Sequence, residues 1–168
     1  MEREIISPIE FDDFLIGKGI DYESSVYFSI PGKPRGKERP RSHRVKNFIT
    51  TYTPKNTVEY ENKIKKCYKE YTNNVKLEGY IEAEITAIFP IPKSIKKKDR
   101  QEMEQGNVRC RTKPDCDNIA KVILDPLNEI AYDDDSQVCS LKAEKFYGIE
   151  PQVKVILRKI ERTSSYED

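Results

Sequence analysis

The segment Tyr80–Phe89 constrains the fold more than any other part of the chain, because its apolar residues recur at every second position. Neighbouring side chains of a β-strand point to opposite faces, so this pattern predicts a strand with one buried face. That face would carry Ile81, Ala83, Ile85, Ala87 and Phe89. Such a strand belongs in a sheet that has a hydrophobic core on one side.

Periodicity and turn residues predict the remaining elements. In chain order they are a strand at Val26–Ile30 that ends at Pro31-Gly32, a helix from Thr53-Pro54 to about Asn73, a helix that begins at Asp117 or Asn118 and is limited by Pro126, and strands at Val138–Tyr147 and Val153–Ile160 around a turn at 148–151. The first helix would bury Val58, Ile64, Cys67, Tyr68 and Tyr71, and the second Ile119, Val122, Ile123 and Leu127. The stretch Lys93–Thr112 is either a short charged helix at Ile95–Gln105 or a mobile arm.

The resulting order, β-α-β-α-β-β, indicates an α+β fold with one mixed sheet of about four strands covered by two to three helices. A chain of 168 residues suits a single domain. We assign residues 24–162 to this domain, residues 1–23 to an acidic N-terminal extension with a short helix around Pro8–Leu15, and residues 163–168 to a C-terminal tail.

The composition excludes a membrane protein and favours a cytoplasmic one. No apolar run approaches the roughly 20 residues that span a bilayer, and the start MEREIISPIEFDDF lacks the basic and apolar regions of a secretion signal. The four cysteines (Cys67, Cys110, Cys116 and Cys139) include no C-x-x-C pair, and His43 is the only histidine. We therefore expect reduced thiols and no zinc site.

The formal net charge is only +1, but the cations are concentrated in two segments. Residues 33–46 hold seven Lys or Arg and one acid, Glu38, and residues 93–113 are basic again. With Phe48 and Tyr52 nearby for stacking, the first segment favours contact with DNA or RNA over a surface loop without a partner. The predicted nucleic-acid contacts are Lys33, Arg35, Lys37, Arg39, Arg41, Arg44, Lys46 and Lys113.

Acidic residues gather elsewhere, at Asp115, Asp117 and the run Asp133–Asp135. On an extended segment before a helix, Asp115 and Asp117 would point to one side, as two ligands of one hard cation such as Mg²⁺ must. A bound metal would polarise a scissile phosphate and activate water, and Lys121 would neutralise charge in the transition state. The alternatives are an N-cap with a turn residue, a solvated acidic loop and a plain surface lysine. The run at 133–135 lacks the ligand spacing of a calcium loop.

Four motifs, taken together, resemble the signature of RusA-type Holliday junction resolvases. They are P-G-K-P-x-G-K-x-R-P-R at 31–41, K-P-D-x-D-N-x-x-K at 113–121, D-x-L-N at 125–128 and D-D-x-Q-V at 134–138. The resemblance implies a homodimeric, magnesium-dependent endonuclease in which Mn²⁺ can replace Mg²⁺ and no small-molecule cofactor is needed. Such enzymes introduce paired nicks across four-way DNA junctions in recombination and repair, and prophages often encode them.

By the same resemblance, the essential carboxylates fall on Asp115, Asp117 and Asp135, and the required lysine falls on Lys121. The D-D-x-Q pattern selects Asp135 over its neighbour Asp134. Supporting roles fall on Asn118, which would cap and orient, on Asp125, which would anchor the helix end or Lys121, and on Asn128, Asp134 and Gln137. Two alternatives stay open: a metal-dependent nuclease with less structural selectivity, and a DNA-binding protein without catalytic activity.

Overall fold

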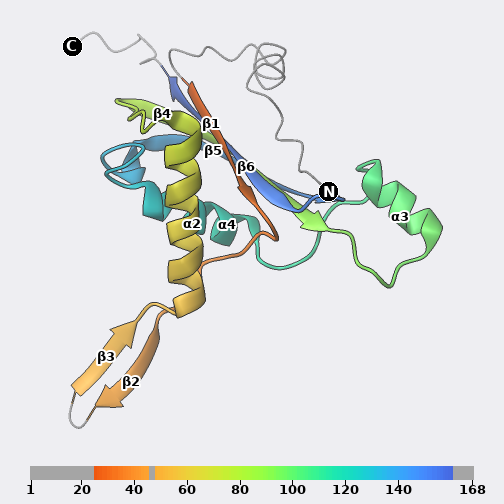
Figure 1. Cartoon of the computed structure of the whole chain (residues 1–168), viewed down its shortest axis with the longest axis horizontal. Coiled ribbons are helices and arrows are strands. Elements are labelled where there is room, and N and C mark those ends of the chain that lie inside the picture. Colours follow the sequence, from red (N-terminus) through yellow and green to blue (C-terminus); the bar gives the residue numbers. More distant parts are fainter. Residues whose placement is uncertain (1–24, 46–47, 161–168) are drawn as a thin grey trace.

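A four-stranded mixed sheet forms the centre of the computed structural model, which describes residues 25–45 and 48–160 (Figure 1). Its strands are β1 (Ser25–Pro31), β4 (Tyr80–Pro90), β5 (Val138–Gly148) and β6 (Gln152–Ile160). They lie in the order β1-β6-β4-β5. Strand β6 is antiparallel to both of its neighbours, and β4 is parallel to β5. The predicted α+β fold with a mixed sheet of about four strands is therefore confirmed.

Strands β5 and β6 follow each other in the chain but do not pair, because β4 lies between them. The connection at 149–151 crosses the end of β4. Gly148 sits where this crossing is tightest: a Cβ atom there would lie only 2.6 Å from Cγ2 of Ile88. Only glycine allows so close an approach. Because β4 lies between β5 and β6, the turn predicted at 148–151 is a crossover connection rather than a hairpin.

Two helices cover one face of the sheet, as Figure 1 shows for α2 (Lys55–Thr72) and α4 (Cys116–Leu124). A third, α3 (Lys97–Glu104), confirms the short charged helix expected at 95–105, but it buries no residue and lies beyond the end of the sheet. Two 3₁₀ turns, η1 (Asp125–Leu127) and η2 (Asp135–Gln137), follow α4. As predicted, α4 stops just before Pro126, whose ring cannot continue an α-helix.

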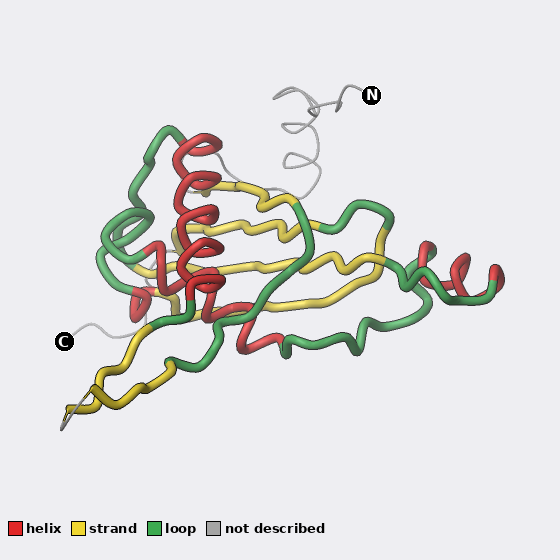
Figure 2. The backbone as a smooth tube through the Cα atoms, turned by 60° about the horizontal axis from the view of Figure 1, so that its bottom comes forward, coloured by secondary structure: helices red, strands yellow, loops and turns green. Residues whose placement is uncertain are grey.

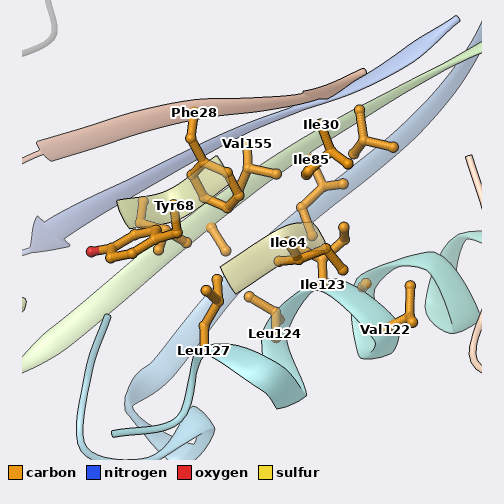
Figure 3. Packing of buried hydrophobic residues seen from close by; sticks show 14 of the residues in the cluster. Phe28, Ile30, Ile64, Tyr68, Ile85, Val122, Ile123, Leu124, Leu127 and Val155 are labelled. Carbon is orange, nitrogen blue, oxygen red and sulfur yellow. The ribbon is translucent and has the colours of Figure 1, made fainter. Parts of the chain in front are cut away.

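The core lies between the sheet and these two helices (Figure 3). All five apolar residues predicted to face it from β4 are buried, and the alternation is complete along the strand. The rings of Phe28 on β1 and Tyr68 on α2 meet edge to face, with centroids 5.3 Å apart. On the opposite face of the sheet, Arg158 pairs with Glu82 at 2.9 Å and with Glu84 at 3.1 Å. The two glutamates on the polar face of β4 thus form ion pairs with Arg158 on the neighbouring strand β6.

The buried face of α2 differs from the predicted one in two places. Val58 and Tyr71 are 40% and 53% exposed, so their assignment to the core was wrong. The face that packs on the sheet instead runs through Thr57, Tyr60, Ile64, Cys67, Tyr68 and Thr72. The helix also begins one residue later than predicted, with Pro54 rather than Thr53 at the N-cap position. Polar Thr57 and Thr72 complete the buried stripe, which an apolar pattern does not reveal.

Part of the basic segment read as a loop is a two-stranded hairpin formed by β2 (Arg41–Val45) and β3 (Phe48–Tyr52). It extends away from the sheet and from α2 in both views (Figures 1 and 2). The hairpin has no buried apolar face on β3, because all side chains of this strand are exposed. Alternation of polar and apolar residues could therefore not reveal it.

Three predictions fall outside the described residues: the extension at 1–23 with its helix at Pro8–Leu15, the tail at 163–168, and the nucleic-acid contact at Lys46. The four cysteines are free thiols, as expected. Among residues 25–45 and 48–160, no helix is long and apolar enough to span a bilayer.

The corrected face of α2 can be tested by a pair of truncations. Ile64→Ala removes a fully buried side chain and should lower the free energy of unfolding by about 2–5 kcal/mol. Val58→Ala, six residues earlier on the exposed side, should lower the free energy of unfolding by less than about 1 kcal/mol. Urea denaturation followed by circular dichroism measures both. Equal losses would mean that the helix is rotated relative to the structure.

Candidate active site

The start of α4 presents two aspartates to solvent. Asp115 occupies the N-cap position in an extended conformation (φ −74°, ψ 160°), but its side chain makes no capping hydrogen bond. Asp117 lies in the first turn of the helix, and both side chains are exposed. The helix thus begins earlier than predicted, so Asp117 and Asn118 are not its caps and Asp117 is not on an extended segment. Both carboxylates lie near the positive end of the helix dipole.

The loop between β1 and β2 packs against this helix start. The backbone N–H of Lys37 donates to Oδ1 of Asn118 over 2.8 Å. A Cβ atom at Gly36 would lie 2.7 Å from both Nδ2 of Asn118 and Cβ of Pro114. Contact this close is open only to glycine, so Gly36 allows the loop to dock. Asn118 therefore orients the basic loop rather than capping the helix.

Lys37 anchors the same loop through its side chain. Its ammonium group lies 2.5 Å from Oδ2 of Asp125 and 3.3 Å from Oε1 of Glu61. Burial works to lower the pKa of Lys37, but hydrogen bonds and charges from Asp125 and Glu61 outweigh it and leave the pKa above its ordinary value. The structure thus engages Lys37 with two carboxylates, and Asp125 pairs with Lys37 rather than with Lys121.

Docking of the loop creates a cleft beside the first aspartate. The cleft has a volume of about 460 Å³ and is lined by Gly36, Lys37, Glu38, Lys113, Pro114, Asp115 and Asn118. It brings together two motifs that are about 75 residues apart in the chain. One cation predicted to bind phosphate, Lys113, therefore lies next to one carboxylate predicted to bind metal.

Lys145 on β5, which was not among the predicted site residues, supports the segment that leads to Asp115. Its ammonium group donates to the carbonyl oxygens of Thr112 at 3.0 Å and Pro114 at 3.1 Å. The Thr112 hydroxyl also lies 3.2 Å from the Tyr147 hydroxyl on the same strand. These bonds fix the backbone just before the aspartate. The pairing is set by tertiary structure, so no local pattern could have revealed it.

A second cationic cleft, of about 260 Å³, lies between the basic loop and α2. Its cations are Lys33 and Arg35, both predicted to contact nucleic acid, and Lys63, which sequence reasoning missed. Lys63 donates to the Pro31 carbonyl oxygen, and this bond places it beside the loop. The helical period of α2 puts Lys63 on an exposed face, but only the docked loop brings it to the other two cations. The remaining described cations of the segment, Arg39, Arg41 and Arg44, are exposed.

The acidic run divides into different environments. Asp134 caps η2 by accepting a hydrogen bond from the Ser136 N–H at 3.1 Å. Hydrogen bonds from the side chain and then the backbone of Ser136 lower the pKa of Asp134. Gln137 accepts from the Asp133 N–H at 2.7 Å and donates to the Gly79 carbonyl at 2.9 Å. Asp133 pairs with Lys76. Asp134 and Gln137 thus stabilise the turn through these hydrogen bonds. Asp135 is half-buried, and its carboxylate forms no hydrogen bond or ion pair with the described residues.

Asp135 lies near the buried side chain of Tyr132. The Tyr132 hydroxyl donates to the Leu124 carbonyl at 2.8 Å, and burial, with the nearby charges of Asp135 and Asp125, raises the pKa of Tyr132 above its usual range.

Within the described chain, no three His, Cys, Asp or Glu side chains are close enough to enclose a metal ion. Asp115 and Asp117 offer exposed carboxylate oxygens, the donors that Mg²⁺ prefers, so these two fit a metal that keeps several waters. Lys121 is exposed on α4 one turn after Asp117. Asn128 has a buried side-chain oxygen without a hydrogen-bond partner in the described part of the chain.

The anchoring role of Lys37 leads to a stability prediction. Lys37→Met leaves Asp125 and Glu61 partly buried without their cation, and we expect the free energy of unfolding to fall by about 1–3 kcal/mol. Because the pKa of Lys37 is raised on folding, its contribution is fully present at neutral pH and is lost only above the ordinary lysine value of 10.5. The control is Lys33→Met, an exposed position where less than about 0.5 kcal/mol is expected. Equal effects in urea denaturation would contradict the anchoring role.

Comparison with known proteins identifies the family of the chain. The chain matches the family Endodeoxyribonuclease RusA over residues 31–158. It is also 31% identical over 137 residues to a protein of Bacillus subtilis (strain 168) named Uncharacterized protein YqaN, an alignment that covers 80% of this chain and 96% of that relative. The family match includes both clefts, α4 and the acidic run, and it lies within the domain expected at 24–162. The chain therefore belongs to the RusA endodeoxyribonuclease family.

Proposed function

We propose that this protein is a magnesium-dependent endonuclease that resolves four-way DNA junctions by paired nicks. The observation that carries the proposal is the cleft in which the docked basic loop and Lys113 meet Asp115. A nuclease needs cations to hold a phosphate beside the carboxylates that hold its metal, and this cleft supplies both. A DNA-binding protein without catalytic activity would not require exposed carboxylates that make no capping hydrogen bond at the start of α4.

Asp115 and Asp117 would hold the metal; the family motif assigns Asp135 as the third carboxylate, although it forms no single cluster with the other two among the described residues. The assignment prefers Asp135 to Asp134 because the Asp134 side chain is already used as a cap. A bound Mg²⁺ supplies Lewis-acid polarisation of the scissile phosphate and lowers the pKa of an attacking water, and Mn²⁺ can replace it. Lys121, on the same helix, would neutralise charge that develops on the phosphate oxygens.

The cations of the two clefts would carry the DNA backbone toward the carboxylates. Lys113 lies in the first cleft, and Lys33, Arg35 and Lys63 line the second. Contacts of this kind with phosphate hold DNA in register without reading its sequence. Lys37 is set apart from this group, since its ammonium group is engaged by Asp125 and Glu61. Its work is to keep the loop in place.

A four-way junction is cut symmetrically on two strands, which requires two active sites related by a two-fold axis. We therefore propose that the working form is a homodimer acting in recombination and repair, with a prophage as its genomic setting. The alternative within the same chemistry is a nuclease with less structural selectivity. It shares the carboxylates, and only the choice of substrate separates the two.

The proposal is tested by cleavage of a labelled synthetic four-way junction beside linear duplex of the same sequence, with Mg²⁺ or with EDTA. We expect paired nicks in the junction alone, none with EDTA, and a loss of about a thousandfold in Asp117→Asn, because a metal contact is worth several kcal/mol of transition-state stabilisation. The matched control is Asp133→Asn, which removes a nearby carboxylate that pairs with Lys76 and should stay within about threefold of the wild type.

Two results would count against the proposal in different ways. Equal cutting of duplex and junction would favour the less selective nuclease. Binding of junctions without cutting under Mg²⁺ or Mn²⁺ would remove the enzymatic assignment and leave a DNA-binding protein.

A further inference from the structure

The hairpin β2–β3 carries three aromatic rings on one of its faces. Its register pairs His43 with Thr50 and Arg41 with Tyr52, so the alternation of side chains puts His43, Phe48 and Tyr52 on one face. The rings of His43 and Tyr52 confirm this, with centroids 5.6 Å apart and an interplanar angle of 66°. We call these three residues the aromatic face. Ile49 lies on the opposite face, beside the Ser42 and Thr51 hydroxyls, which are 3.1 Å apart.

This aromatic face is open to solvent. Phe48 is 77% exposed and Tyr52 is 46% exposed. Neither α2 nor the sheet covers the hairpin, which stands away from both in the two views (Figures 1 and 2). A two-stranded ribbon is only marginally stable without further packing. An exposed ribbon that keeps large rings on one face is therefore suited to a ligand with flat, apolar surfaces.

The charge around the aromatic face selects nucleic acid as that ligand. Arg41 lies on the aromatic face opposite Tyr52 and pairs with Glu38 at 3.2 Å, whereas Arg44 lies on the other face. The segment 41–52 contains no acidic residue. The loop that leads to the hairpin and helix α2 supply three further cations, Lys33, Arg35 and Lys63, at the second cleft. A second copy of this chain would have to bring the same cations against each other, whereas DNA offers phosphates for the cations and base faces for the rings.

Continuous duplex does not expose base faces, because each base is stacked between its neighbours. A branch point does, since stacking is interrupted where the strands exchange. We propose that the aromatic face stacks on nucleobases at the branch point, with Phe48, the most exposed of its rings, making the principal contact. This inference rests on the proposed action on four-way junctions and deepens it, since it names the feature by which the protein distinguishes a junction from duplex.

The test measures binding without cleavage, in EDTA, to a four-way junction and to linear duplex of the same sequence. Stacking on one base is worth about 1–3 kcal/mol, so Phe48→Ala should weaken junction binding roughly 5- to 150-fold and leave duplex binding within about twofold. The matched control is Ile49→Ala, an equally exposed residue on the other face, which should change neither affinity. A junction with 2-aminopurine at the branch point should change its fluorescence with the wild type and with Ile49→Ala, but not with Phe48→Ala.

The outcomes separate this inference from the proposed function. Equal losses for junction and duplex, or no 2-aminopurine response to the wild type, would overturn the aromatic-face contact while junction cleavage could still stand. A change of oligomeric state in Phe48→Ala, measured by sedimentation, would mean that the face binds a second copy and would also overturn it. Selective loss of junction binding, in a protein that cuts nothing, would uphold the contact and remove only the nuclease.

Discussion

The ion pairs of Lys37 with Asp125 and Glu61 are the interaction on which the site depends. They join three parts of the chain: the basic loop, the end of α4 and the middle of α2. Together with the Lys37–Asn118 hydrogen bond, they hold a cationic loop against a helix whose start carries exposed aspartates. Without this docking, the cleft between Gly36 and Asp115 would not exist, and the cations and carboxylates would lie on separate surfaces.

The fold could be predicted from the sequence where burial is periodic. The alternation along β4 gave both the strand and its buried face, because one face meets the core and the other meets Arg158. The order of strands could not be predicted, since β5 pairs in parallel with β4 rather than with its neighbour in the chain. The hairpin β2–β3 was also missed, because a ribbon that buries nothing leaves no hydrophobic pattern. Thr57 and Thr72 were missed on α2 because they are buried although polar.

For the site as well, local sequence motifs could be predicted, whereas contacts between residues far apart in the chain could not. The motif at 113–121 placed two aspartates at the start of a helix, and that is where they lie, although the helix begins earlier than the capping pattern suggested. All lysines have the same side chain, so the sequence does not distinguish their roles. In the structure, the groups that each lysine contacts differ. Lys113 lines the cleft, Lys37 anchors the loop, Lys145 supports the backbone before Asp115, and Lys63 joins the second cationic cleft.

The central claim is that a divalent metal binds at the start of α4, directly beside the docked basic loop. The most direct test is titration of ¹⁵N-labelled protein with Mn²⁺, whose unpaired electrons broaden the amide signals of nearby residues. We expect selective broadening at 115–118 and at 36–38, and loss of this broadening in Asp117→Asn with the remaining spectrum unchanged. Broadening confined to other acidic segments, or broadening at 115–118 without any at 36–38, would contradict it.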